Sequence, residues 1–383
     1  MTFFLLGPFY PLRGGIAQYI GVLGKKLAEQ GHQVKVLAFK KQFPRFLFPG
    51  QTQFETSQDV IHLDSELLFV PWNPFSWYRT FRRIKKGNPD AVIVKYWMPF
   101  FAPGFAAVSA LTRWFTKVKT IFIIDNVIPH EQRPGDRLLT RFAFRWVDAF
   151  IVQSDVVRRD LLDWYPKAKN AIVRQVAHPI YDCYADREIT PEEARRQLGL
   201  KPAGRLLLFF GLVRQYKGLD TLIQALPRVI SELGKDTHLL IAGEFYEKEE
   251  RYTAQIRALQ LQDFITIANQ YVPNEQVYLY FRSADLLVLP YRSATQSGVI
   301  QVAYHFGLPI VSTMVGGLKE VVAEGETGYL VEPENPAKIA DAIIRFYKED
   351  RLLEFKRNAK QAGERFSWQT MISNLVEMAS SPR

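Results

Sequence analysis

Short apolar runs alternate with amphipathic stretches along the whole 383-residue chain, and this alternation limits most strongly what it can fold into. Near-continuous apolar strands separated by helices are typical of parallel sheets covered on both faces. Because two such series follow each other, we expect an α/β protein with two Rossmann-like parallel-sheet domains. The predicted strands are residues 2–7, 33–39, 60–64, 91–97, 120–125 and 149–154, then 205–211, 238–244, 264–268, 286–291, 309–313 and 328–331.

The boundary between the two series lies near residues 178–204. A polar linker is followed there by Thr190, Pro191 and Glu193, the pattern of a capping box at a helix start. We therefore expect an N-terminal domain over 1–180 and a C-terminal domain over 181–365. The remaining segment, 366–383, reads as an amphipathic helix left over after the second sheet is complete.

Composition narrows the class of protein. Apolar residues make up 48% of the chain, enough for two ordinary cores. The one cysteine, Cys183, allows no disulfide within the chain, which fits a reducing cytosol. The first residues read as a β-strand and not as a signal peptide, and no run reaches about 18 unbroken apolar residues. We expect a cytoplasmic protein.

The positive charge is unevenly distributed. Residues 1–180 hold 25 Lys and Arg against 13 Asp and Glu, whereas residues 181–383 hold 24 against 26. The excess in the first half indicates either an anionic partner or simply a basic soluble surface. The candidate partners are a membrane surface, a phosphate-bearing lipid and a nucleic acid. Residues 77–86 and 112–119 mix Trp and Phe with cations, as interfacial segments do.

In open parallel sheets, ligands bind beyond the carboxyl ends of the strands, so the strand-to-helix loops should carry the chemistry. Gly14 and Gly15 stand at the first helix start, where bare backbone can approach an anion. In the loop after residue 211, Arg214 and Lys217 flank another helix start. An Arg and a Lys placed there suit a diphosphate.

A polar cluster follows the strand 286–291. Amides of a turn that leads into a helix form an anion cradle, and the side chains there can bond hydroxyls or phosphate oxygens. The cluster comprises Thr295, Gln296, Ser297, Gly298, Val299 and Gln301. A further glycine turn precedes Glu320, which either complements a helix dipole or faces a ligand.

In the first half, Asp125 ends a strand and His130 follows in the same loop. A His near carboxylates indicates either a structural role or acid–base and positioning work. No zinc pattern, Asp-x-Asp-like metal pair or Walker A motif occurs in a suitable loop, so we expect neither a metal nor a separate cofactor.

Taken in order, these motifs resemble a retaining glycosyltransferase of the GT-B fold, glycosyltransferase family 4 (group 1). The similarity covers essentially the whole chain, through GGIAQYI, FGLVRQYKGLDTLIQA, SGVIQVAYHFGLPIV, VGGLKEVV and GETGYLVEPENP. It implies that the C-terminal domain binds a nucleotide-diphosphate sugar, UDP- or GDP-linked. It also implies that the N-terminal domain binds a glycan, glycolipid or lipid-linked acceptor and that the last helix crosses back to that domain.

Carried over by motif, Arg214 and Lys217 correspond to the pair that neutralises the diphosphate, although the family's Arg commonly stands where Leu212 is. Gly14 and Gly15 correspond to the loop that closes over the phosphates, and Tyr271 with Val272 to a base-binding strand end. The usual Glu-x7-Glu is absent from residues 292–307, which carry a TQSG-type block instead.

The resemblance implies hexosyl transfer with retention and without a metal, in polysaccharide or cell-envelope synthesis at the inner face of the plasma membrane. Two alternatives stay open: a catalytically degenerate subunit that binds nucleotide sugar, and a GT-B-type UDP-sugar epimerase. Nucleic-acid binding is disfavoured because no RRM, helix-turn-helix or OB pattern occurs.

Overall fold

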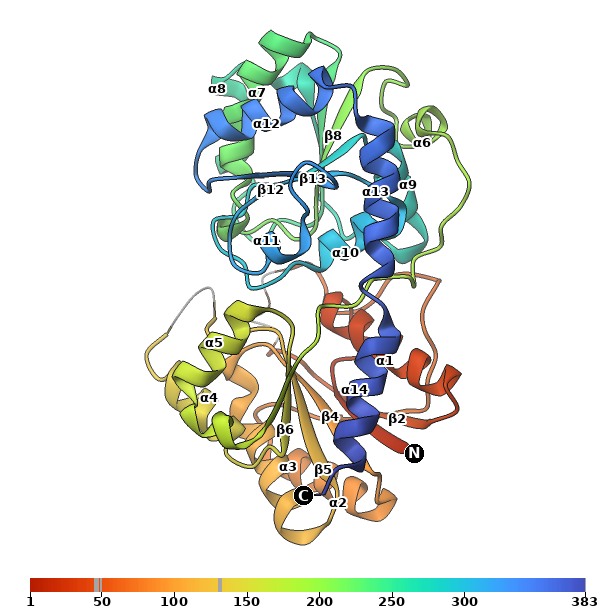
Figure 1. Cartoon of the computed structure of the whole chain (residues 1–383), viewed down its shortest axis with the longest axis vertical. Helices are drawn as coiled ribbons and strands as arrows, with labels where there is room; N and C mark the ends of the chain where they lie inside the picture. Colours follow the sequence, from red (N-terminus) through yellow and green to blue (C-terminus); the bar gives the residue numbers. More distant parts are fainter. Residues whose placement is uncertain (45–47, 49, 130–132, 383) are drawn as a thin grey trace. The chain divides into compact units, whose positions relative to one another are not determined.

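The computed structural model describes residues 1–44, 48, 50–129 and 133–382, and the chain forms two compact units. The N-terminal unit comprises residues 1–56, 60–179 and 367–383. The C-terminal unit comprises residues 57–59 and 180–366. Each unit is an α/β sandwich around a parallel sheet, which confirms the expected fold class (Figure 1).

The sheet of the N-terminal unit has the order β3-β2-β1-β4-β5-β6-β7 in the part of the chain that the structure describes. All of its neighbouring strands are parallel. The strands are β1 (Thr2–Gly7), β2 (Gln33–Phe39), β3 (Ser65–Phe69), β4 (Ala91–Tyr96), β5 (Lys119–Ile124), β6 (Ala149–Val152) and β7 (Ile172–Gln175). The helices are α1 (Gly15–Glu29), α2 (Pro74–Gly87), α3 (Ala102–Phe115), α4 (Asp136–Phe144), α5 (Asp155–Trp164) and α14 (Trp368–Ser380), with 3-10 turns at Pro99–Phe101 and Pro166–Asn170.

The C-terminal helix α14 belongs to the N-terminal unit, where it packs against α1 and β5. The Lys119 ammonium donates a hydrogen bond of 2.8 Å to the carbonyl of Met378 near the end of this helix. At its beginning, the side chain of Ser367 accepts from the amide of Gln369 at 3.0 Å, an N-cap that starts the helix.

The sheet of the C-terminal unit has the order β10-β9-β8-β11-β12-β13, again entirely parallel. The strands are β8 (Arg205–Phe210), β9 (Thr237–Ala242), β10 (Ile265–Ala268), β11 (Leu286–Leu289), β12 (Ile310–Thr313) and β13 (Gly328–Val331). The helices are α6 (Pro191–Gln197), α7 (Leu219–Leu233), α8 (Glu250–Ala258), α9 (Val277–Ser283), α10 (Gly298–Phe306), α11 (Leu318–Val321), α12 (Pro336–Lys348) and α13 (Leu352–Glu364). As the sequence predicts, the Thr190 side chain caps α6 by accepting from the Glu193 amide at 3.2 Å.

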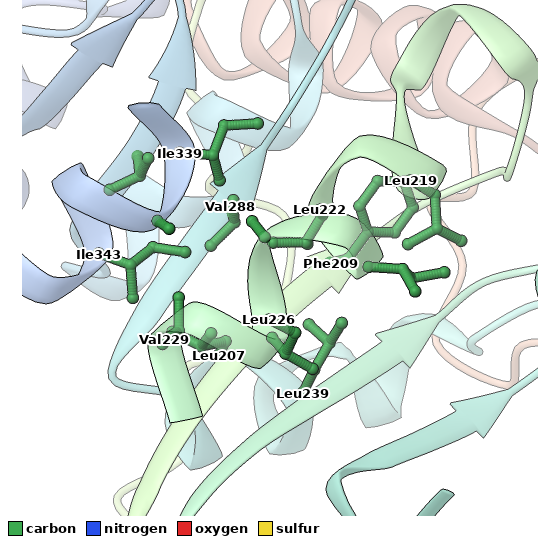
Figure 2. Packing of buried hydrophobic residues seen from close by; sticks show 14 of the residues in the cluster. Leu207, Phe209, Leu219, Leu222, Leu226, Val229, Leu239, Val288, Ile339 and Ile343 are labelled. Atoms are coloured by element: carbon green, nitrogen blue, oxygen red, sulfur yellow. The ribbon is translucent and has the colours of Figure 1, made fainter. Parts of the chain in front are cut away.

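One face of this second sheet is covered by α7 and α12, which pack against each other (Figure 2). Leu222 and Leu226 of α7 and Ile343 of α12 are fully buried against strand residues such as Leu207 and Val288. Because apolar residues recur on one stripe of each helix, burying that stripe drives both helices onto the sheet. This core holds the β8–α7 loop in place.

The strand prediction for the N-terminal unit was wrong in two places. Residues 60–64 are not a strand, and the edge strand is Ser65–Phe69 instead. Ile61 and Leu63 turn toward α1, where Gly21 and Gly24 leave room for them, so this apolar pattern serves helix packing and not a ladder. The strand Ile172–Gln175 was missed because it is a four-residue edge strand whose last two residues are exposed.

Within the described residues, no helix has the length and apolarity needed to cross a membrane.

Candidate functional site

The loop between β8 and α7 brings a buried cation to the carboxyl end of the C-terminal sheet. Lys217 ends a short 3-10 turn (Gln215–Lys217) and is 8% exposed. A Cβ placed on Gly211, whose φ is 102°, would stand 3.1 Å from the Lys217 amine and 3.5 Å from Cγ2 of Val299. The loop glycine, the amine and the first turn of α10 therefore lie close together.

Lys217 lies in a largely apolar setting, with its amine 5.6 Å from the centre of the Tyr291 ring. Burial, helped by the charge of Arg214, lowers the pKa of Lys217 to about 7. Arg214 itself is half-buried and stacks its guanidinium 5.0 Å from the Tyr246 ring. When an anion binds here, the Lys217 amine can therefore take up a proton, whereas the guanidinium of an arginine such as Arg214 is always charged.

The next glycine explains the tight shape of this loop. Gly218 begins α7 with φ at 65°, a conformation that L residues seldom adopt. A Cβ on Gly218 would lie 2.0 Å from the carbonyl oxygen of Pro290, so only glycine lets the loop pack against the chain that follows β11.

Arg292, which was not among the residues predicted from the sequence, stabilises the same loop through several hydrogen bonds. Its guanidinium donates to the carbonyl of Gln215 at 2.8 Å, and its amide donates to the carbonyl of Tyr216 at 2.7 Å. The guanidinium also pairs with both oxygens of Asp220 in the first turn of α7, at 3.0 and 2.8 Å. These bonds fix the two residues that precede Lys217.

The start of α10 is built differently from an ordinary capped helix. Ser297 occupies the N-cap position, yet its side chain makes no capping hydrogen bond to the helix. Gly298 is packed so closely that a Cβ would stand 2.9 Å from Cε2 of Tyr181. Because the first amides of a helix have no acceptor within it, the Gly298–Val299 start can receive an anion.

A second loop supports this helix start. The amide of Gly317 donates to the carbonyl of Thr295 at 3.2 Å, and Gly316 approaches so closely that a Cβ would lie 1.5 Å from the carbonyl of Ala294. Glu320 lies just beyond, exposed on the short helix α11. The structure thus brings residues 294–298 and the Gly316–Gly317 turn together, as parts of one carboxyl edge.

Gln301 lies one turn into α10 and is 1% exposed. Its Oε1 has no hydrogen-bond partner among the residues that the structure describes. An unsatisfied buried amide oxygen is costly, so such an atom indicates a partner that arrives from outside the chain. Gln296, five residues earlier, is half-buried.

Two further predicted positions, Tyr271 and Val272, lie after β10. Val272 is buried in the hydrophobic core of the C-terminal unit, and Tyr271 beside it is half-buried after β10. His130 lies outside the described residues.

The N-terminal unit has its own arrangement at the carboxyl ends of its strands. Gly14 begins α1 with φ at 108°, without a side-chain cap, and a Cβ there would meet nothing within 4 Å. The predicted glycine turn is therefore an uncapped helix start with open space beside it, followed by Gly15 as the first helical residue.

Asp125, which follows β5, pairs with Lys95 of β4. The two charged atoms lie 2.5 Å apart and both side chains are almost fully buried. The Lys95 ammonium also donates to Oε1 of Gln153 at 2.8 Å and lies 3.5 Å from the centre of the Tyr19 ring. Burial lowers the pKa of Lys95, and the Asp125 carboxylate opposes that shift. The sequence selected Asp125 but missed Lys95.

The Tyr19 side chain joins this ion pair to two further rings. Its hydroxyl accepts from Nε2 of Gln153 at 3.1 Å, and its ring lies 5.2 Å from His178 and 5.1 Å from Trp368. His178 and Trp368 stand next to the points where the chain leaves and re-enters the N-terminal unit. Burial and the charge of Lys95 lower the pKa of His178 to about 3, so this ring is neutral at pH 7.

Among the described residues, no group of three or more His, Cys, Asp or Glu side chains lies close enough together to hold a metal ion. The candidate site of the C-terminal unit therefore offers a buried amine, a neighbouring guanidinium and a helix start with open amides. Two parallel α/β units with a candidate anion site at the carboxyl edge define the class of two-domain Rossmann-like proteins, which bind ligands beyond the carboxyl ends of their strands.

Two family models match the chain. Residues 14–175 match the glycosyl transferase 4-like domain, and residues 204–349 match glycosyl transferases group 1. The chain therefore belongs to the group 1, or family 4, glycosyltransferases.

Relatives and solved structures extend this result. D-inositol 3-phosphate glycosyltransferase of Acidothermus cellulolyticus is 26% identical, over 95% of this chain and 84% of the relative. N-acetyl-alpha-D-glucosaminyl L-malate synthase of Bacillus anthracis is 22% identical, over 90% and 87%. In fold, the chain is similar to Anabaena HepE in complex with UDP, with a TM-score of 0.75 at 15% identity over 99% of this chain and 100% of that one. It is also similar to a sucrose-phosphate synthase from Thermosynechococcus elongatus, with a TM-score of 0.74 at 19% identity over 99% and 98%. The expected GT-B fold is confirmed.

Proposed function

We propose that this glycosyltransferase moves a hexose-type sugar from a UDP- or GDP-linked donor to a hydroxyl group, with retention of configuration. The observation that carries the proposal is the buried Lys217 amine, placed between Gly211 and the first turn of α10. A lone buried amine is unfavourable without a counter-charge, and a diphosphate supplies one. The acceptor is a glycan, a glycolipid or a lipid-linked sugar.

In the transfer, the bond from C1 of the sugar to the diphosphate breaks and a bond from C1 to the acceptor oxygen forms on the same face. The acceptor proton passes to the leaving phosphate. Negative charge grows on the diphosphate as the bond breaks, so Lys217, Arg214 and the α10 amides stabilise the transition state more than the ground state. No carboxylate nucleophile and no metal is required in this scheme.

The donor contacts follow from the same arrangement. Thr295, Ser297 and Gln301 offer side-chain groups near the α10 start that suit ribose or sugar hydroxyls. Gln301 supports this most directly, because its buried oxygen has no partner in the described chain. The full proposed donor set is Gly14, Gly15, Tyr271, Val272, Thr295, Gln296, Ser297, Gly298, Val299, Gln301 and Glu320.

On the acceptor side, Asp125 fits a positioning role better than that of a base. A carboxylate that is paired with the Lys95 ammonium at 2.5 Å, and that is 6% exposed, is poorly reached by a substrate. On the sequence alone, we assign His130 to the same acceptor-side loop.

The cellular setting is part of the proposal: a cytoplasmic enzyme of polysaccharide or cell-envelope synthesis that works at the inner face of the plasma membrane. The curated relatives support a hydroxyl acceptor, since the names of two of them specify inositol phosphate and malate.

The test is product analysis with the purified chain. UDP- and GDP-linked hexoses are screened by thermal shift, because a ligand that binds the native state raises the melting temperature. The donor that binds is then followed by NMR, with and without EDTA. We expect slow hydrolysis of that donor and release of the sugar with its original anomeric configuration. An inverted product contradicts retention, loss of turnover in EDTA contradicts metal independence, tight binding without turnover indicates a degenerate subunit, and an epimerised sugar indicates an epimerase.

A further inference from the structure

The outer face of α2 in the N-terminal unit carries two exposed aromatic rings. Phe75 is 82% exposed and Tyr78 is 52% exposed, one turn apart on the same stripe of the helix. Large apolar side chains exposed to this degree side by side are unusual on a soluble surface and mark interaction sites.

The same stripe continues as a row of cations. Arg79, Arg82, Lys85 and Lys86 are all exposed, and none of them pairs with a carboxylate in the described part of the chain. Residues 67–89 contain five Lys and Arg and no Asp or Glu. The fifth, Arg83, turns inward, where it pairs with Glu66 at 2.7 Å. The exposed charges on the outer face of α2 are therefore all positive.

The helix that presents this face is firmly anchored. Asn73 caps its first turn, since its side chain accepts from the amides of Phe75 and Ser76 at 3.0 and 3.4 Å. On the inner face, Phe81 and Ile84 are buried, and the Trp77 indole donates to the carbonyl of Val70 at 3.0 Å. The exposed rings are thus held outward by a rigid element.

Further aromatic side chains extend the surface at the end of α3, which lies beside α2 (Figure 1). Phe115, 58% exposed, lies 6.0 Å from the Phe81 ring and 6.0 Å from the Lys85 amine. Trp114, 63% exposed, lies 6.0 Å from Trp146, which follows α4. Phe115 thus extends the cationic stripe of α2, and Trp114 adds a second exposed ring at the end of α3.

We propose that this surface, the outer face of α2 with Trp114 and Phe115, lies in the interfacial region of a bilayer that contains anionic lipid. Aromatic rings and Lys or Arg on one exposed helix face are the combination that favours this region. A second copy of the chain is a poorer occupant, because two cationic faces repel each other. A single-stranded nucleic acid is poorer too, because it binds in grooves lined with rings and not along one helix. The inference rests on the proposed function for its biological setting, but its test needs no activity.

The experiment is sedimentation of the full chain with vesicles of phosphatidylcholine alone or of phosphatidylcholine with phosphatidylglycerol. We expect binding to the anionic vesicles, weakened strongly between 50 mM and 500 mM salt because screening shortens the range of charge attraction. The double variant Phe75→Ser/Tyr78→Ser should lose binding at both salt concentrations. Arg82→Gln/Lys86→Gln should lower the vesicle partition coefficient by about five-fold for each charge removed.

Two matched controls separate this surface from general charge and general hydrophobicity. Lys167→Gln/Lys169→Gln removes two exposed cations of the same unit that lie outside α2, in the 3-10 turn Pro166–Asn170. This variant should leave vesicle binding unchanged. Leu353→Ser removes an apolar side chain that is 81% exposed in the C-terminal unit, also without effect. All of these sites are exposed, and donor hydrolysis, measured in parallel without vesicles, should equal that of the parent chain.

The proposal is overturned if the chain does not bind anionic vesicles, or if the lysine control weakens vesicle binding as much as the α2 variants do. It is also overturned if the α2 variants only abolish self-association, or only abolish binding of a single-stranded oligonucleotide. Absence of donor hydrolysis with intact vesicle binding would contradict the proposed function and leave this surface standing.

Discussion

The ammonium of Lys95 lies 2.5 Å from the carboxylate of Asp125, in a part of the N-terminal unit where both side chains are almost completely removed from water. Such a pair is costly to bury, yet breaking it leaves one charge without compensation. The Tyr19 ring and the Gln153 amide oxygen satisfy the rest of the ammonium. The pair therefore fixes β4, β5 and α1 relative to one another.

Replacing one partner of this pair should destabilise the fold strongly. Asp125→Leu should lower the free energy of unfolding by about 3–5 kcal/mol, because Lys95 is then buried alone. Lys95→Met/Asp125→Leu should recover most of that loss, since an apolar pair needs no counter-charge. Urea unfolding followed by tryptophan fluorescence measures both. The control is Arg228→Ala, which breaks an exposed pair with Asp341 and should cost less than about 1 kcal/mol. A double variant no more stable than Asp125→Leu would contradict this reading.

A second prediction concerns acid stability. The pKa of His178 is lowered to about 3 in the fold, whereas an unfolded His titrates near its ordinary value of 6.5. Below pH 6.5 the unfolded chain therefore binds a proton that the folded chain excludes. We expect stability to fall as the pH drops from 6.5 toward 3. His178→Phe should flatten that slope in urea unfolding at several pH values, and an unchanged slope would show that other groups are responsible.

These two findings show what the sequence could and could not supply. Gly211, Arg214 and Lys217 could be predicted because they lie within seven residues after one apolar strand, so local order alone brings them together. Lys95 gave a signal, a cation inside an otherwise apolar run, but its partner Asp125 lies 30 positions away, just after the next strand β5. Pairing of that kind depends on strand order, which periodicity does not fix.

Arg292 is a second example of a contact that the sequence could not predict. A loop arginine ordinarily reads as solvated, and its partners Gln215, Tyr216 and Asp220 lie more than 70 positions earlier in the chain. Only the order β8-β11 in the sheet brings the two loops together. The wrongly predicted strand at residues 60–64 has a similar cause, since its apolar side chains pack on α1 and not on a strand neighbour.

Arg292 should matter for turnover although it need not touch the donor. Arg292→Gln removes the charged bonds to Asp220 and loosens the turn that carries Lys217, so we expect kcat to fall about ten-fold or more, since small misplacements of catalytic groups are costly. The matched control is Arg251→Gln, because Arg251 also pairs with Asp220, at 2.8 Å, but within the described chain makes no hydrogen bond to residues 215–217. Equal losses in the two variants would show that Asp220, and not the loop, is what Arg292 serves.

Gln301 allows a test that separates binding from folding. Because its Oε1 is buried without a partner in the described chain, Gln301→Leu should leave the free protein as stable as the parent or more so. The same variant should bind the nucleotide more weakly, which shows as a smaller thermal shift at equal ligand concentration. Gln301→Leu with an undiminished shift would remove this residue from the donor site.

The last prediction concerns the protonation of Lys217 when the donor binds. In the free protein its pKa is about 7, chiefly because it is buried, so at pH 8 most molecules carry a neutral amine. A bound diphosphate favours the ammonium and raises that pKa, so binding takes up a proton. Affinity should therefore fall as the pH rises above 7, by at most about ten-fold per pH unit.

Calorimetric titration of UDP at pH 8, in two buffers that differ in ionisation enthalpy, measures this proton directly. We expect an uptake approaching one proton for the parent chain and none for Lys217→Met. Arg214→Gln serves as the sign control: because the Arg214 charge is the second cause that lowers the Lys217 pKa, its removal should raise that pKa and reduce the uptake at pH 8. UDP binding by the parent chain at pH 8 without proton uptake would mean that the Lys217 amine does not meet the diphosphate.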